Sequence, residues 1–182
     1  MIRVTSGTAK NTKLRTPDIE KFRAVQDVVK QSVFSVLGEA SVRGATVLDL
    51  FCGSGGLGIE ALSRGASWCD FVDEHSESVQ TVLSNLQRCG FMEKAQMFNK
   101  NSLKFVTKAE RTYDIIFADP FYNDLNQRHL LKMLPKVMCD KGVAVFFHGD
   151  QLPMHKFIEE AALKIATQRK FGNSFFTMLQ SA

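Results

Sequence analysis

The sequence predicts an α/β fold in which an open, mostly parallel sheet carries helices on both faces. From Thr46 onward, short apolar runs alternate with segments of helical periodicity, as in repeated βαβ units. A glycine-rich turn, Gly53–Gly58, joins the first run to its helix. Only Gly172 and Asn173 separate the last two runs, which therefore form an antiparallel hairpin. A sheet of this kind binds its ligand beyond the carboxyl ends of its strands.

The composition indicates one globular domain over residues 1–182. Hydrophobic residues make up 45% of the chain and charged residues 23%, which is ordinary for a soluble protein. No apolar run approaches the roughly 18 residues that would cross a membrane, and the first residues are not an apolar signal segment. We therefore expect a cytoplasmic protein with no membrane partner.

The cysteines and histidines are scattered and lack the spacing of metal ligands. We expect reduced thiols rather than disulfides, and no bound metal. These residues are Cys52, Cys69, Cys89, Cys139, His75, His129, His148 and His155.

Residues 1–22 form a basic arm or a small hairpin, with Gly7 and Pro17 as turn signals. Basic residues crowd this end of the chain, which predicts a surface for a polyanion. A merely solvated basic end is the alternative. The residues expected to contact the polyanion are Arg3, Lys10, Lys13, Arg15 and Arg23.

The first helix is expected over Ala24–Leu37, with Gly38 as its stop signal. Its apolar residues share one face, so we interpret the stripe as core and not as a binding surface. The stripe consists of Val25, Val28, Val29, Ser32, Val33, Val36 and Leu37.

The later elements follow from the same periodicities. The strands expected are Val47–Phe51, Cys69–Val72, Gln96–Asn99, Tyr113–Ala118, Gly142–Phe147, Leu163–Phe171 and Ser174–Leu179. Helices are expected over Gly56–Ser63, from a cap at Ser76 to Gly90, around Leu103–Thr107 and over Met154–Ala162. A further helix is expected to begin at a capping box formed by Asp124 and Gln127 and to end or kink at Pro135. Its apolar residues are Leu130, Leu131 and Leu134. The helix after Ser76 is expected to bury Val79, Val82, Leu83 and Leu86.

The turn after the first strand carries the pattern Gly53-x-Gly55-x-x-Gly58. Glycines let the backbone approach a ligand closely, and a helix N-terminus offers free N–H groups. The pattern therefore predicts a nucleotide cradle. A purely structural tight turn is the alternative.

Polar residues stand where the neighbouring strands end. Asp73 follows the second strand about 20 residues after the glycines, where an acid accepts the hydroxyls of a ribose. Asn101 and Ser102 follow the third strand and are placed to reach an adenine. Asp119 follows the fourth strand. A single acid at a strand end is often only a solvated cap, but two acids beside a glycine loop favour a binding site.

The tetrapeptide Asp119-Pro120-Phe121-Tyr122 resembles the (D/N)PP(Y/F) motif of methyltransferases that modify exocyclic amines of nucleobases. A carboxylate and a proline carbonyl accept the two amine hydrogens, which directs the nitrogen lone pair toward the methyl donor. An aromatic neighbour holds the face of the base. A plain turn is the alternative.

The whole chain resembles the RsmD-type 16S rRNA (guanine-N2) methyltransferases. Residues 47–55, VLDLFCGSG, nearly reproduce the family's VLDLFAGSG. Residues 3–14 are similar to its N-terminal arm, residues 71–73 to its FVE, and residues 171–173 to its closing YGD. The resemblance implies a Rossmann-like class I methyltransferase fold with a seven-stranded sheet and with S-adenosylmethionine over the first three strands.

The resemblance also implies roles for single residues. It implies a catalytic role for Asp119, Pro120 and Tyr122. The residues implied to bind the cofactor are Asp49, Phe51, Gly53, Ser54, Gly55, Asp73, Glu74, Asn101, Ser102 and Asp119. The implied partner is 16S ribosomal RNA or the small ribosomal subunit, and the enzyme is expected to be a monomer.

Three departures from the family pattern leave alternatives open. Phe121 replaces the second proline of the motif, Asn101 replaces an aspartate, and Arg23-Ala24-Val25 replaces Arg-Pro-Thr. The alternatives are a methyltransferase for another base, RNA or small molecule, and a catalytically silent RNA-binding module. A nicotinamide-dependent dehydrogenase would explain the glycines and Asp73 but would leave Asp119 and its neighbours without a role.

Overall fold

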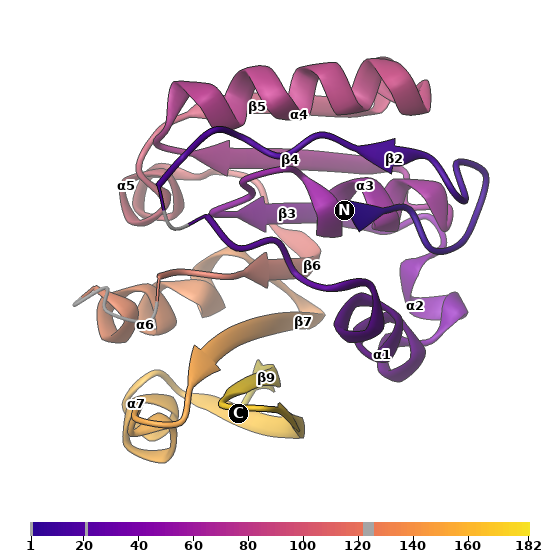
Figure 1. Ribbon diagram of the computed structural model, residues 1–182. Coiled ribbons are helices and arrows are strands. Elements are labelled where there is room, and N and C mark those ends of the chain that lie inside the picture. Colours follow the sequence, from indigo (N-terminus) through magenta and orange to yellow (C-terminus); the bar gives the residue numbers. More distant parts are fainter. Residues whose placement is uncertain (1, 21, 122–125) are drawn as a thin grey trace.

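The computed structural model describes residues 2–20, 22–121 and 126–182 (Figure 1). A seven-stranded sheet has the order β5-β4-β3-β6-β7-β9-β8. Strands β5 to β7 in this order run parallel to one another, and β9 pairs antiparallel with both β7 and β8. The predicted Rossmann-like α/β fold, with a mostly parallel sheet and a C-terminal antiparallel hairpin, is confirmed.

The element bounds lie close to those expected from periodicity. The strands are β1 (Ile2–Arg3), β2 (Lys13–Leu14), β3 (Thr46–Leu50), β4 (Trp68–Asp73), β5 (Ala95–Asn99), β6 (Tyr113–Ala118), β7 (Met138–Gly149), β8 (Leu163–Phe171) and β9 (Ser174–Ser181). The helices are α1 (Asp27–Leu37), α2 (Glu39–Val42), α3 (Gly56–Ser63), α4 (Ser76–Cys89), the 3₁₀ helix η1 (Met92–Lys94), α5 (Ser102–Lys108), α6 (Gln127–Val137) and α7 (Met154–Glu160).

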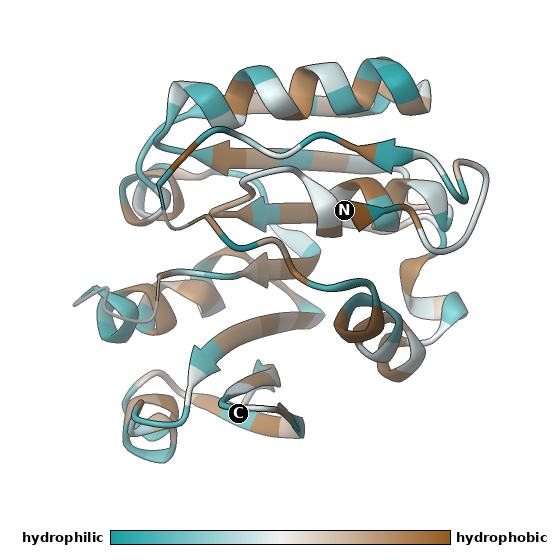
Figure 2. Ribbon diagram, viewed as in Figure 1, coloured by the Kyte–Doolittle hydropathy of each residue, from teal (hydrophilic) through white to brown (hydrophobic). Residues whose placement is uncertain are grey.

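A hydrophobic core lies on each face of the sheet. Because side chains alternate along a strand, Val47 contributes to one core and its neighbour Leu48 to the other. The first core includes residues of α1, α3, α4 and the N-terminal hairpin, and the second includes residues of α5, α6 and α7. Figure 2 shows hydrophobic residues along β3 and β6, as expected of strands covered on both faces.

The parallel strands end together at one edge of the sheet. Asp49 lies opposite Phe71 on β4 and opposite Phe117 on β6. With this register, Leu50 pairs with Val72 and with Ala118. The segments that follow β3, β4 and β6 therefore meet at the same edge, toward which the arrowheads point in Figure 1.

Three local expectations were wrong. The first helix begins at Asp27 rather than at Ala24. The N-cap of α4 is His75 rather than Ser76, whose hydroxyl donates instead to Glu77. Leu83 is exposed on α4, while Ser78 and Asn85 are buried there.

Pro135 does not end its helix, because α6 continues to Val137. Four apolar side chains of α6 are buried against the sheet, and this packing outweighs the hydrogen bond that a proline cannot donate. They are Leu130, Leu131, Leu134 and Val137. Asp124, the expected cap of this helix, lies outside the described residues.

The N-terminal residues form a small hairpin in which β1 pairs antiparallel with β2. The fully buried Glu60 carboxylate of α3 accepts hydrogen bonds from Thr5 N (2.8 Å) and Thr5 Oγ1 (2.7 Å). Arg64 Nε donates to the same carboxylate at 2.8 Å. Lys30 Nζ of α1, also buried, lies 3.6 Å from Glu60 and donates to the Arg3 carbonyl. One carboxylate thus joins the hairpin, α1 and α3.

Replacing Glu60 by Gln tests this junction. Among the described residues, the change leaves the half-buried Asp27, at 3.3 Å, as the acidic partner of the buried Lys30 ammonium. We expect the free energy of unfolding to fall by roughly 2–4 kcal/mol in urea titrations, since an uncompensated buried charge is costly. Glu39→Gln, in an exposed pair with Arg43, is the control and should leave the midpoint unchanged. Equal midpoints for the two variants would contradict the assigned role.

Candidate functional site

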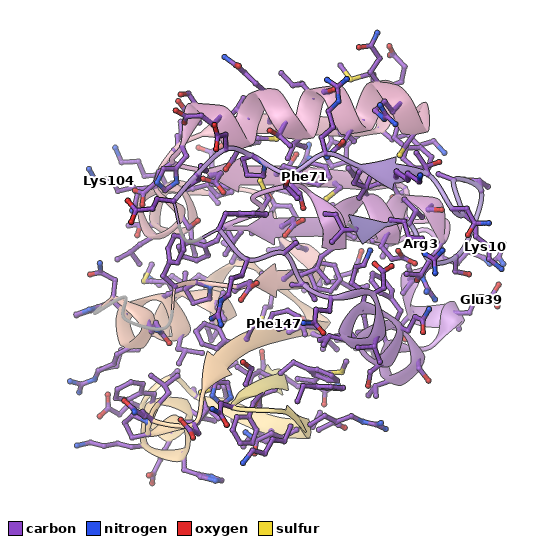
Figure 3. All side chains as sticks on the ribbon, in the orientation of Figure 1. Arg3, Lys10, Glu39, Phe71, Lys104 and Phe147 are labelled. Carbon is purple, nitrogen blue, oxygen red and sulfur yellow. The ribbon has the colours of Figure 1, made fainter. Side chains whose placement is uncertain are left out.

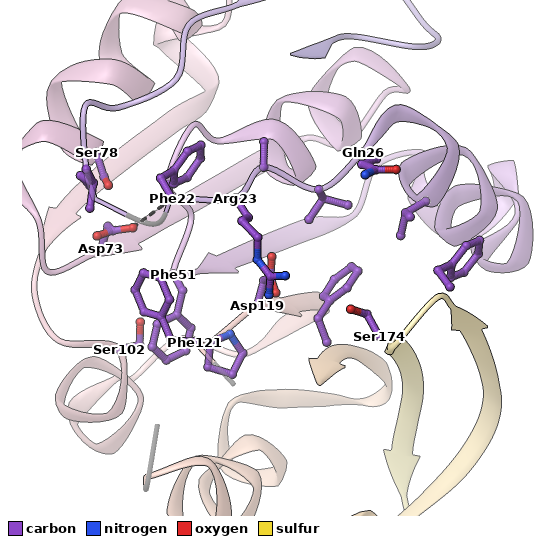
Figure 4. A pocket seen from close by; sticks show the side chains of 18 of the residues that line it. Phe22, Arg23, Gln26, Phe51, Asp73, Ser78, Ser102, Asp119, Phe121 and Ser174 are labelled. Atoms are coloured by element: carbon purple, nitrogen blue, oxygen red, sulfur yellow. Dashed lines mark hydrogen bonds between the residues drawn. The ribbon is translucent and has the colours of Figure 1, made fainter. Parts of the chain in front are cut away.

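A cavity of about 690 Å³ lies at the carboxyl ends of β3, β4 and β6 (Figure 4). From β2 the chain runs to this edge of the sheet and then returns to α1 (Figure 1). Residues 22–26 of the returning segment form one wall of the cavity. The loops after the three strands form the floor, and the loop between β8 and β9 forms a further wall.

The glycine loop has the backbone geometry that its residues predict. Gly53 and Gly55 adopt positive φ angles of 51° and 74°, and Gly55 is the N-cap of α3. A Cβ atom at Gly58 would lie 2.4 Å from the Phe71 ring, so this glycine allows α3 to pack on β4. Phe51, which lines the cavity, also adopts a positive φ of 56°. Such a strained non-glycine residue is typical of a functional loop.

Asp49 shapes this loop from beneath. Its Oδ2 accepts a hydrogen bond from Gly58 N at 2.9 Å. The side chain is buried and is not part of the cavity wall. Burial raises the pKa of the Asp49 carboxyl well above its usual range, and the hydrogen bond from Gly58 offsets only part of this shift.

Asp73 connects the end of β4 to the glycine loop. Its Oδ2 accepts from Gly53 N at 2.9 Å, and its Oδ1 accepts from His75 N at 3.0 Å. The carboxylate lines the cavity. His75 Nδ1 also lies 3.1 Å from Oδ1. Because a carboxylate offers about four acceptor sites, Asp73 retains capacity for a hydroxyl donor of a ligand.

Ser78 supplies a polar atom on the same side of the cavity. Its hydroxyl is buried and has no hydrogen-bond partner among the residues that the structure describes. Ser78 belongs to the cavity lining, and Figure 4 places it close to Asp73. A buried polar atom without a partner is costly unless a ligand or water satisfies it. Together with Asp73 and the glycine loop, it fits a nucleoside with ribose hydroxyls.

Asp119 follows β6 on the opposite side of the cavity from Asp73. The Arg23 guanidinium lies beside its half-buried carboxylate in Figure 4. Burial raises the pKa of Asp119 to about 7, and the charge of Arg23 lowers it by less. This carboxyl group is therefore poised between its two ionisation states at neutral pH, a property that concentrates at functional sites.

The residues after Asp119 complete the wall. Pro120 is buried, whereas the Phe121 ring is 54% exposed and faces the cavity. Gln127 Nε2, at the start of α6, donates to the Phe121 carbonyl at 3.1 Å. Tyr122, the predicted aromatic platform, lies outside the described residues.

The interpretation of the valine stripe as core was wrong for Val28, whereas Val25 and Val29 pack against the core and line the cavity as well. Val25, Val28 and Val29 line the cavity, and Val28 is 58% exposed. Phe22 and Ser78 are further lining residues that the sequence did not single out. The breadth of the stripe was the available signal, since a helix needs a narrower apolar face to pack on one side of a sheet.

Several predicted cofactor residues support the cavity from outside its lining. The Ser54 carbonyl accepts from Asn85 Nδ2 at 2.9 Å, and Gly55 begins α3. Asn101 Oδ1 caps α5 by accepting from Lys104 N at 3.2 Å. Asn101 Nδ2 donates to the carboxylate of Glu74, which does line the cavity, as does Ser102.

The predicted basic residues do not gather at the cavity. Arg23 is in its wall, whereas Arg3 and Lys10 lie at the opposite end of the sheet from Lys104 (Figure 3). Arg3 forms an ion pair with Asp27 at 3.3 Å. Lys13 belongs to β2, and the Arg15 guanidinium donates to Ser84 on α4 at 3.3 Å.

Two further searches cover residues 2–20, 22–121 and 126–182. Among them, no group of three or more histidine, cysteine or acidic side chains is arranged to hold a metal ion. No helix in the same ranges has the length and apolar character needed to span a bilayer.

Comparison with known proteins gives consistent matches. The profile of a family described as "Conserved hypothetical protein 95" matches residues 2–180. A Bacillus subtilis protein provisionally named rRNA methyltransferase YlbH is 39% identical over 167 residues, which cover 89% of this chain and 90% of that protein. The Escherichia coli protein named ribosomal RNA small subunit methyltransferase D is 32% identical over 143 residues, covering 78% and 68%.

The fold is shared with solved structures as well. A structure of an Escherichia coli protein provisionally named methyltransferase yhhF superposes with a TM-score of 0.84 at 22% identity. The match covers 100% of this chain and 99% of that chain. The likeness extends over the hairpin, the sheet and the segments that form the cavity.

The raised pKa of Asp119 predicts a change in stability on its removal. Because its folded pKa of about 7 exceeds the unfolded value, ionisation destabilises the folded state as pH rises from about 4 to 7. Asp119→Asn should therefore raise the free energy of unfolding by roughly 1–2 kcal/mol more at pH 8 than at pH 5. Denaturant titrations at the two pH values measure this, with the exposed Asp140→Asn as control. A variant less stable than the wild type at pH 8 would contradict the prediction.

Proposed function

We propose that this chain, which belongs to the family described as "Conserved hypothetical protein 95", transfers methyl groups from S-adenosylmethionine to ribosomal RNA of the small subunit. The observation that carries the proposal is the placement of Asp119 and Pro120 in one cavity with Asp73 and Gly53. The names of the Bacillus and Escherichia relatives support the substrate class.

The finer proposal is that the target is the exocyclic N2 amine of a guanine in 16S ribosomal RNA. The Asp119-Pro120 pair supports it, because a carboxylate and a carbonyl together accept the two hydrogens of a primary amine. The aromatic residue that follows the pair in the motif, Tyr122, is proposed to stack on the base. The target guanine must be unpaired or turned out of its stack to enter the cavity.

The residues that would hold the cofactor are those of the glycine loop and the ends of β4 and β5. Asp73 would accept the ribose hydroxyls, and Glu74, Ser102 and Phe51 would contact the adenosine side of the cavity. S-adenosylmethionine supplies a methyl group on a sulfonium, which is already electrophilic. The remaining task of the protein is to position the acceptor amine and to exclude water.

Asp119 carries out the positioning in its ionised form. Both oxygens of an ionised carboxylate accept hydrogen bonds, whereas a protonated carboxyl donates from one oxygen and accepts more weakly with the other. With a pKa of about 7, Asp119 exchanges its proton in the neutral pH range, so the ionised form is accessible there. Arg23 favours this ionised form, since an adjacent positive charge stabilises a carboxylate.

Asp119→Ala should abolish methyl transfer and leave cofactor binding within about threefold of the wild type, because it removes an acceptor for the amine only. The assay uses labelled S-adenosylmethionine and small ribosomal subunits from a strain that lacks the protein, followed by nucleoside analysis. Labelled N2-methylguanosine is the expected product. Asp140→Ala, an exposed position near the start of β7 and outside the cavity lining, is the control. Retained transfer in Asp119→Ala would refute the catalytic assignment, and another labelled nucleoside would refute the guanine-N2 target.

Gln127 is expected to compensate for the missing second proline. A proline at position 121 would restrict the backbone, and here the hydrogen bond from Gln127 to the Phe121 carbonyl restrains the same residue. Gln127→Ala should lower kcat about tenfold, with an unchanged KM for S-adenosylmethionine.

Adding Phe121→Pro to the Gln127→Ala variant should restore most of the lost kcat. The exposed Gln80→Ala on α4 serves as control. A loss of kcat that the added proline does not relieve would show that Gln127 acts in some other way.

A further inference from the structure

We propose that a basic groove along α5 binds the phosphate backbone of the RNA, an inference that rests on the proposed function. The α5 groove, of about 600 Å³, is lined by residues of α5 and of the segments on either side of it, including Lys100, Asn101, Lys104, Lys108, Glu110 and Arg111. It is separate from the catalytic cavity and contains none of the basic residues of the N-terminal arm.

The groove carries excess positive charge. Its four cations are Lys100, Lys104, Lys108 and Arg111, against the two carboxylates Asp70 and Glu110. Lys104 and Lys108 are one helical turn apart, so they lie on the same face of α5 about 6 Å apart along its axis. Such a row of lysines is suited to bind successive phosphate groups of a flexible RNA strand.

The three lysines are available for a ligand. Within the described part of the chain, no carboxylate forms an ion pair with Lys100, Lys104 or Lys108. Lys100 Nζ lies 5.8 Å from the centre of the Phe98 ring. All three side chains are exposed. Their charges are therefore not neutralised within the fold.

Asp70 offsets the charge of Arg111 but not that of the three lysines, because its carboxylate is held by partners within the fold. It is buried and accepts from Tyr113 Oη at 2.7 Å and from Trp68 Nε1 at 2.6 Å. Arg111 donates to it at 3.3 Å. Among the described residues that line the groove, Glu110 is the exposed acid, against three exposed lysines.

The position of the groove connects it to the reaction. Asn101 lines the groove and the next residue, Ser102, lines the catalytic cavity, so the two meet at the start of α5. Figure 3 places Lys104 at the end of the sheet opposite Arg3 and Lys10. RNA with a base in the cavity thus meets α5 before it reaches the N-terminal hairpin.

Backbone contacts of this kind give affinity without sequence preference and depend on salt. The groove variant for the test is the double substitution Lys104→Glu/Lys108→Glu. Its control is the double substitution Lys156→Glu/Lys164→Glu, which makes the same charge change at exposed positions of α7 and β8. Binding of 16S ribosomal RNA is measured from 50 to 300 mM salt, as is binding of S-adenosylhomocysteine.

The groove variant should bind RNA at least tenfold more weakly, and the slope of log K against log salt should be about one to two smaller. S-adenosylhomocysteine affinity and the melting temperature should match those of the control. Saturating RNA should restore most of the methyl transfer, as a KM effect.

Equal RNA affinity in the groove and control variants would overturn the proposal. So would loss of S-adenosylhomocysteine binding in the groove variant, since the lysines would then belong to the cofactor site. If the wild type neither binds nor methylates ribosomal RNA, the proposed function itself fails, and the groove assignment fails with it. If the wild type methylates ribosomal RNA while the groove and control variants bind RNA with equal affinity, the groove assignment alone fails.

Discussion

The arrangement around the cavity depends on the hydrogen bonds and the ion pair of the buried Glu60 carboxylate. It belongs to α3, the helix that the glycine loop begins, and it holds both the hairpin, through Thr5, and α1, through Lys30. The segment between the hairpin and α1 contains Phe22 and Arg23, which form a wall of the cavity. Fixing both ends of this segment on α3 places that wall over the glycine loop. A buried ion pair adds little net stability on average, so its value here is one of position.

The strand register supplies the other half of the site. Because β3, β4 and β6 are parallel and in register, the residues after them reach the same edge of the sheet at nearly the same height. Asp73 and Asp119 therefore face one cavity although they are far apart in the sequence. Asp49 lies below the same edge and closes the glycine turn through Gly58. The three acids differ in their surroundings: Asp49 supports the glycine loop from beneath, Asp73 joins the end of β4 to that loop, and Asp119 lies beside Arg23.

The sequence predicted those parts of the fold and site that local patterns determine. A strand, a glycine turn and a helix follow one another directly, so the glycine loop and the acids after β4 and β6 could be located from spacing alone. Phe22 and Ser78 could not be located in this way. Phe22 reaches the cavity because the chain returns past the carboxyl edge of the sheet, and Ser78 reaches it because of the orientation of α4 about its axis. The same limit explains Val28, since periodicity identifies an apolar face but not what covers it. The same limit explains why the residues of the basic arm do not gather at the cavity. A count of charges along the chain does not say where the side chains lie, and the tip of the hairpin lies at the amino ends of the strands.

Burial has two opposing effects on Asp119 as a hydrogen-bond acceptor, and the fold balances them. Burial makes the carboxylate a stronger acceptor, because little water competes for its lone pairs, yet burial also favours the protonated form, which is a weaker acceptor and donates from one oxygen. Arg23 offsets part of this cost, and the resulting pKa is about 7. Without a nearby cation the acid would be protonated over more of the neutral range, and in full contact with water it would be ionised but a weaker acceptor. The wall that Arg23 belongs to is the one that Glu60 holds in place, so the buried ion pair and the ionisation of Asp119 are parts of one arrangement.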